Sequence, residues 1–194
     1  MRNNTNKMVK LAVLSAVSLL LMFAIRFPII PAAPFLEYEP GDLPILIGTF
    51  IYGPGAGLLL TVVVSAIQAF TVSVGSGWIG AVMHIISTGA MVLVAGNIYK
   101  RVHTFKGAII ALIAGTAAMV LIMIPLNLFF TTMFLGVPIE VVKGMIVPVI
   151  IPFNLFKGIA NSTLTIMVYK SVAKILRVEP NPFQKGAKSI SDKI

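Results

Sequence analysis

The chain has 194 residues, 58% hydrophobic and 11% charged, and its 15 Lys and Arg against 6 Asp and Glu give a formal charge of +9. A soluble domain carries about 25% charged residues and disordered segments are poor in apolar ones, so the composition excludes both classes. Nucleic-acid binding is disfavoured as well, because the cations lie at the edges of long apolar runs instead of on one polar surface.

Apolar runs suited to membrane helices, which need about 20 residues, follow one another along the chain. We interpret residues 8–25 as an uncleaved span and not as a secretory signal, because everything downstream is equally apolar. Helices at 41–52 and 58–72 are expected on either side of a break at Gly53-Pro54-Gly55. Further spans are expected at 78–99, 108–130 and 149–172. The prediction is an all-α integral membrane protein, one domain over 1–194, with about six transmembrane helices in one compact bundle.

The distribution of positive charge predicts the orientation of this bundle. Cytoplasmic segments collect Lys and Arg, so both termini are expected in the cytoplasm, with 27–41 as an extracellular loop and 178–194 as a basic cytoplasmic tail. This places 12 of the 15 cations inside: Arg2, Lys7, Lys10, Lys100, Arg101, Lys106, Lys170, Lys174, Arg177, Lys185, Lys188 and Lys193. Arg26 and Lys143 fall at outer boundaries, so Lys157 is the cation that orientation does not explain.

Several kinds of chemistry are disfavoured by what the sequence lacks. There is no GxxxxGK[ST] phosphate loop, no cysteine, no metal-ligand spacing and no Ser/His/Asp pattern, so neither an enzyme nor a metal or cofactor site is expected. Glu37, Glu39 and Asp42 are expected at the outer mouth, so no acid is expected deep in a span and Lys157 is expected to have no deep acidic partner. Energy for moving a solute would therefore come from another subunit.

The last predicted span carries a polar stripe. Asn154, Lys157, Asn161 and Thr165 are spaced three, four and four residues apart and lie on one helical face, which Asn127 of the fifth span is expected to join. Such a face avoids lipid and indicates a ligand cavity. The alternative is that the amides hold helices together.

The predicted outer loop contains four prolines, which stiffen it and favour a shaped lid over a solvated linker. Asp42 after it is expected only to cap the next helix. His84 has no obvious partner in the sequence, and it either lines a pocket or stays hydrogen-bonded and neutral. Ala12 and Ala16 form a small-residue face on the first span that suits close approach of another helix, inside or outside the chain.

The run from Phe35 to Gly48, which contains Phe35-Leu36-Glu37-Tyr38-Glu39 and Asp42-Leu43-Pro44, resembles the loop and second helix of the riboflavin-binding S components of energy-coupling-factor (ECF) transporters. That family typically reads Phe-Leu-x-Tyr-Asp-x-Ser-Asp-Ile-Pro here, so Glu39 and Gly41 are mild departures. A larger departure is Met83-His84-Ile85, where the family often has Ala-Asn-Phe, and this weakens any role carried over to His84.

The resemblance implies a substrate-binding subunit in a prokaryotic cell membrane that captures riboflavin from outside. It implies a transmembrane coupling subunit, EcfT, docked at Ala12 and Ala16, and two cytoplasmic ATPase subunits that hydrolyse ATP. The substrate-binding residues expected on this basis are Leu36, Glu37, Tyr38, His84, Asn127, Asn154, Lys157 and Asn161. Whether FMN is also accepted is left open, and the alternatives are an S component for thiamine, pantothenate or another vitamin, and a membrane assembly subunit with no ligand.

Overall fold

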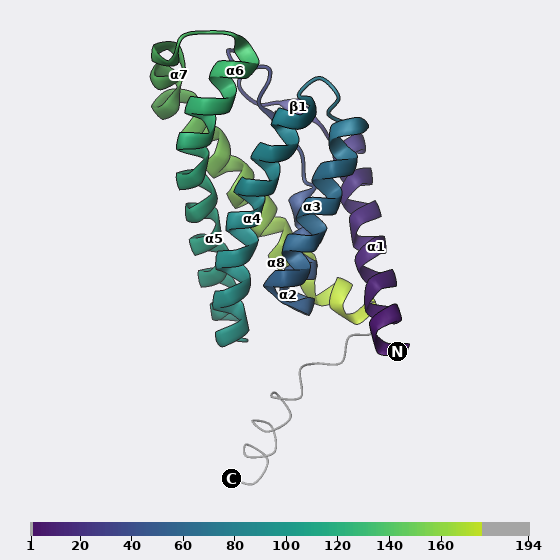
Figure 1. Cartoon of the computed structure of the whole chain (residues 1–194). Coiled ribbons are helices and arrows are strands. Elements are labelled where there is room, and N and C mark those ends of the chain that lie inside the picture. Colours follow the sequence, from purple (N-terminus) through teal and green to yellow (C-terminus); the bar gives the residue numbers. More distant parts are fainter. Residues whose placement is uncertain (1, 176–194) are drawn as a thin grey trace.

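The computed structural model describes residues 2–175 and is almost entirely helical (Figure 1). The long elements are α1 (Arg2–Ala24), α2 (Asp42–Tyr52), α3 (Pro54–Phe70), α4 (Gly77–Arg101), α5 (Phe105–Leu126) and α8 (Ile151–Ile175). The short ones are β1 (Phe27–Pro28), β2 (Glu37–Tyr38), the π-helical turns η1 (Asn127–Thr131) and η2 (Ile146–Ile150), and the helices α6 (Thr132–Leu135) and α7 (Ile139–Met145). All six predicted helical segments are confirmed, with ends shifted by a few residues. The predicted tail 178–194 lies outside the described residues.

The helices form one bundle in which α2 is the central element. It contacts α1, α3, α4 and α8, and α4 packs between α3 and α5. In Figure 1 the start of α1 and the last described turns of α8 lie at one end, whereas α6, α7 and β1 lie at the other. The two ends of the described chain therefore lie at the same end of the bundle.

Four helical stretches of residues 2–175 are long and apolar enough to cross a membrane. They are Asn4–Ala24, Gly77–Arg101, Phe105–Leu135 and Ile139–Tyr169. The helices α2 and α3 are apolar but shorter, so the structure supports a multi-pass membrane protein with four candidate spans and two further apolar helices. Large apolar side chains such as Phe23 (79% exposed) and Phe70 (85% exposed) face outward, which suits a surface that contacts lipid.

The turn between α2 and α3 forms at the predicted break. Gly53 has φ +91°, a left-handed conformation that favours glycine, and Pro54 starts the next helix, where its missing N–H costs no hydrogen bond. Gly57 on α3 lies against the side chain of Thr49, so a larger residue there would push the two helices apart. The stripe of small residues on α3, which includes buried Thr61 and Ser65, thus serves packing within the chain.

The loop 27–41 is an ordered structure. Its ends pair as antiparallel strands with Phe27 opposite Tyr38, and Arg26 forms an ion pair with Glu37 and also donates to the backbone oxygen of Val72. In its middle, Ala33 and Leu36 pack against Phe153 of α8. This confirms the predicted shaped loop and places it across one end of the helices.

Candidate binding site

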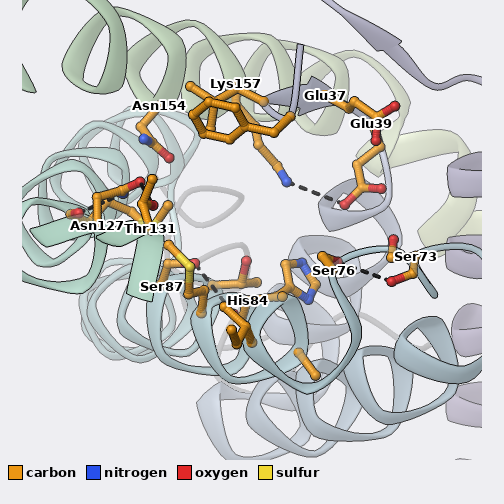
Figure 2. A pocket seen from close by; sticks show the side chains of 18 of the residues that line it. Glu37, Glu39, Ser73, Ser76, His84, Ser87, Asn127, Thr131, Asn154 and Lys157 are labelled. Carbon is orange, nitrogen blue, oxygen red and sulfur yellow. Dashed lines mark hydrogen bonds and ion pairs between the residues drawn. The ribbon is translucent and has the colours of Figure 1, made fainter. Parts of the chain in front are cut away.

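An open pocket lies beneath the loop 27–41, between the ends of α4, α5 with η1, and α8 (Figure 2). Counting its open mouth, it holds about 970 Å³ of unoccupied space, which falls within the usual range for small-molecule sites. Its walls combine apolar side chains from the loop, α4, α5, α6 and α8 with many polar and charged side chains. The apolar residues include Phe35, Leu36, Met119, Met123, Phe134 and Phe153.

The predicted polar stripe of α8 is buried on one face of that helix. The exposed fractions are 2% for Asn154, 0% for Asn161 and Thr165, and 13% for the side chain of Lys157. Of the stripe, Asn154 and Lys157 line the pocket, and Figure 2 shows Lys157 pointing into it from α8. The predicted single face is therefore confirmed, and its outer part lines the cavity.

Lys157 has acidic partners, so the expectation that no deep acid pairs with it is wrong. Its Nζ lies 3.5 Å from Oε1 of Glu39 and 3.9 Å from Oδ2 of Asp42. Both carboxylates are buried, with exposed fractions of 6% and 1%. The chain from β2 to the start of α2 turns inward and carries these side chains between the helices, where burial of an ammonium group requires an anion.

Asp42 is the centre of a buried hydrogen-bond network and does not act as a helix cap. Gly41 is the N-cap residue of α2, with no side-chain cap bond. Oδ1 of Asp42 lies 2.9 Å from Nε2 of His84 and accepts from Thr88 Oγ1 at 3.0 Å, while Oδ2 accepts from Asn161 Nδ2 at 3.1 Å. One carboxylate thereby joins α2, α4 and α8 beneath the pocket.

His84 has two hydrogen-bond partners and also lines the pocket, as both interpretations of the sequence allowed, although the sequence did not indicate which residues the partners are. Its Nδ1 lies 2.7 Å from Oγ of Ser65 on α3, and its Nε2 faces Asp42. Ser65 Oγ itself donates to the backbone oxygen of Thr61 at 2.6 Å. The two ring nitrogens of His84 thereby link Ser65 on α3 to Asp42 on α2. Ser65, His84 and Asp42 therefore form a buried structural bridge between three helices. Of the three side chains, His84 lines the pocket.

Asn127 lies in the π-helical turn η1, where the α-helical ladder of α5 is interrupted after Pro125. Its Nδ2 donates to the backbone oxygen of Met123 at 2.7 Å, and its Oδ1 accepts from Thr131 Oγ1 at 2.8 Å. Asn154 uses Nδ2 in the same way, donating to Ile150 at 2.8 Å. These bonds fix both carboxamides, and each amide keeps hydrogen-bonding capacity for a molecule in the pocket.

The remaining predicted binding residues divide into two groups. Leu36 and Glu37 line the pocket from the loop. Tyr38 and Asn161 are not among its lining residues. The Tyr38 hydroxyl donates to Asn161 Oδ1 at 3.2 Å, and the phenol ring packs edge-on against Phe156 with centroids 5.5 Å apart. Burial raises the pKa of Tyr38, so its hydroxyl stays protonated as a donor.

Glu39 is the main site residue that the sequence reasoning missed. Besides Lys157, it accepts from Nε2 of Gln68 on α3 at 3.0 and 3.2 Å. A signal was available: a lysine in the outer half of a span needs an anion, and the acids nearest that side in the sequence are those of the loop. Gln68, Ser73, Ser87 and Thr88 are further polar lining residues for which the sequence offered no specific pattern.

Ala12 and Ala16 lie far from the pocket, on a face of α1 that is exposed in this chain, whereas Leu11, Leu14 and Ser15 point inward. The small-residue face is therefore not buried within the described chain. Of the two interpretations, approach by a helix outside the chain is favoured for these two alanines.

The fold and the pocket together define a multi-pass membrane protein with a cavity of small-molecule size near one end of a helical bundle. The model of the family "ECF transporter, substrate-specific component" matches residues 6–169. The chain belongs to this family, the substrate-specific or S components of ECF transporters.

Individual relatives agree with this assignment. The riboflavin transporter RibU of Staphylococcus aureus (strain TCH60) is 31% identical over 88% of this chain and 92% of its own length. The riboflavin transporter FmnP of Bacillus subtilis (strain 168) is 29% identical over 84% of this chain and 90% of its own length. A solved S component of a bacterial ECF transporter superimposes with a TM-score of 0.77 at 31% identity, covering 91% of this chain and 99% of that one.

Proposed function

We propose that this chain binds riboflavin in the pocket beneath the loop 27–41 and delivers it for ATP-driven uptake. The observation that carries the proposal is that Asn127, Asn154 and Lys157 all line one pocket that also offers apolar side chains. Relatives that match most of the chain are named riboflavin transporters, which supports the same ligand. The family membership supports a role as the substrate-binding subunit, with no catalysis of its own.

The chemistry of the pocket suits a flavin. Its apolar side chains offer surfaces for a flat aromatic ring, and the carboxamides and the Lys157 ammonium can donate to ring carbonyls. Asparagine oxygens can accept from a ring N–H or from ribityl hydroxyls. Riboflavin is neutral, so it needs no countercharge, and the Lys157 charge is already balanced by Glu39 and Asp42.

The same proposal includes a membrane orientation. The loop 27–41 would face the outside and cover the captured ligand, and both termini would be cytoplasmic, as the excess of Lys and Arg at the opposite end supports. With α2 and α3 counted as short crossings shielded by the other helices, the bundle would have six. Eight residues of α2 are buried, which supports a helix surrounded by protein instead of lipid.

Energy for uptake would come from partner subunits. The exposed face of Ala12 and Ala16 on α1 would dock on the transmembrane coupling subunit EcfT, because small residues let helices approach closely. Two cytoplasmic ATPase subunits would hydrolyse ATP. The proposal requires no metal or further cofactor in this chain.

Purified protein in detergent would test the ligand directly. We expect it to carry or bind one riboflavin per chain, seen by flavin absorbance, mass spectrometry and quenching of flavin fluorescence. Titrations with FMN, thiamine and pantothenate under the same conditions define the specificity. Binding of thiamine or pantothenate in place of riboflavin would overturn the ligand and keep the subunit role, whereas no binding and no ligand-induced thermal stabilisation by any vitamin would favour an assembly subunit.

A further inference from the structure

A second groove lies at the end of the bundle opposite the loop 27–41, where α2 ends, α3 begins and the chain leaves α4. In Figure 1 this is the end that carries the start of α1 and the label of α2. Counting its open side, the groove holds about 1380 Å³ of unoccupied space. It is separate from the pocket of the proposed function, and no residue lines both.

The groove is lined by cations that lack anionic partners. Lys7, Lys100 and Arg101 all line it, and no acidic residue is among the lining residues of the described chain. None of the three forms an ion pair within residues 2–175, where the ion pairs involve Arg26, His84 and Lys157. Lys7 lies over the ring of Tyr52, with Nζ 5.8 Å from the ring centroid. The groove therefore presents uncompensated positive charge.

Hydrogen-bond donors and apolar surface complete the groove. The Tyr52 hydroxyl is buried and has no hydrogen-bond partner among the described residues, which is costly unless something supplies one. The turn at Gly53 leads into α3, a 17-residue helix with no side-chain N-cap bond, and helix N-termini favour anions. Phe50 and Pro54 contribute apolar walls beside these polar groups.

We propose that this groove binds the headgroup of an anionic phospholipid from the leaflet at that end of the bundle. Phosphate oxygens would pair with the three cations and with the α3 N-terminus. The neighbouring residues Met8 (59% exposed) and Val9 (57% exposed) on α1 continue as apolar surface toward the bilayer, where the acyl chains would lie. This continuity favours a lipid over a free phosphate ion or an acidic protein segment, neither of which would use the apolar flank.

The test uses the full chain, purified in mild detergent, and native mass spectrometry with added phosphatidylglycerol or phosphatidylcholine. We expect phosphatidylglycerol to bind at least about tenfold more tightly, since each cation near an anionic lipid contributes a factor of about five. The triple variant Lys7→Gln/Lys100→Gln/Arg101→Gln should lose most of this preference. Lys106→Gln is the matched control, because Lys106 is exposed at the same end but does not line the groove, and it should keep the preference.

Tyr52→Phe provides a second variant that keeps the charge and the shape of the groove. It should weaken phosphatidylglycerol binding by several-fold, with an unchanged elution profile. Equal binding of the two lipids, or equal loss in the triple variant and Lys106→Gln, would overturn the proposal. Competition by soluble glycerol phosphate at the lipid's own concentration would assign the groove to a free anion. Unchanged lipid binding combined with loss of copurifying coupling subunit in the triple variant would make it a protein-docking surface.

Discussion

Nζ of Lys157 lies 3.5 Å from Oε1 of Glu39, although the two residues are 118 positions apart in the sequence. The pair bridges the outer loop and α8 at the wall of the pocket. It holds the ammonium group in a fixed position while Asn154 presents its carboxamide one turn earlier. The outer loop is thus attached to the binding site by a buried ion pair as well as by apolar contacts.

Replacing Lys157 by Ala should weaken riboflavin binding by about tenfold or more, because one charge-assisted hydrogen bond is worth roughly 1.5–3 kcal/mol. Combining it with Asn154→Ala should weaken binding further. Fluorescence quenching of riboflavin measures both. Lys143→Ala is the matched control, an exposed lysine on α7 at the same end of the bundle, and it should bind as the unmodified chain does. Unchanged affinity in the double variant would reduce the polar stripe to helix packing.

The ion pair predicts a specific order of thermal stabilities. Lys157→Met leaves both Glu39 and Asp42 buried without their cation, and losing one partner of a buried pair costs about 3–5 kcal/mol. Glu39→Gln should cost less, because Lys157 keeps Asp42 at 3.9 Å. The double variant Glu39→Gln/Lys157→Met should be more stable than Lys157→Met alone. Melting followed by size-exclusion chromatography checks the order, and strictly additive losses would show that the two side chains do not interact.

The bridge between α3, α4 and α2 should depend on His84. His84→Leu removes one hydrogen bond from Asp42 and one from Ser65, so we expect the melting midpoint to fall by about 5–10 °C, taking 2–4 °C per kcal/mol for a chain of this size. Ser65→Ala should have a smaller effect, because Asp42 keeps both His84 and Thr88. A midpoint unchanged by His84→Leu would mean that the bridge contributes nothing net.

The exposed alanines of α1 give a prediction on assembly. Ala12→Leu/Ala16→Leu should leave riboflavin binding and the melting midpoint unchanged, because both side chains are exposed in this chain. Copurification with the coupling subunit should be lost. Ala66→Leu serves as the control, because Ala66 is an exposed alanine on α3. This substitution enlarges a side chain in the same way but outside the small-residue face of α1. Retained copurification in the α1 variant would place the docking surface elsewhere.

The absence of native cysteine allows a direct test of orientation. Lys143→Cys on α7 should react with a membrane-impermeant maleimide added to intact cells, whereas Lys106→Cys should react only after the membrane is opened. Both side chains are exposed, so accessibility within the protein is matched. The reverse labelling pattern would invert the proposed topology.

The sequence by itself determined the membrane class, the six helical segments, the turn at Gly53-Pro54 and the polar face of α8. These features are local. A helix in a bilayer must satisfy its own backbone, so it appears as a long apolar run, and a polar face has the helical spacing wherever it packs. The family resemblance rested on one local motif around Phe35-Leu36, and the match over residues 6–169 confirms it.

Only the tertiary structure decided which charged groups meet. The interpretation of Asp42 as a cap followed from its place before an apolar helix, and the partners of His84 could not be identified from its neighbours in the sequence. Burial selects partners by free energy, since an isolated charge or imidazole is costly inside the bundle, but the partner is set by how α2, α4 and α8 pack. That packing joins residues more than 40 positions apart, and no periodicity along the chain records it.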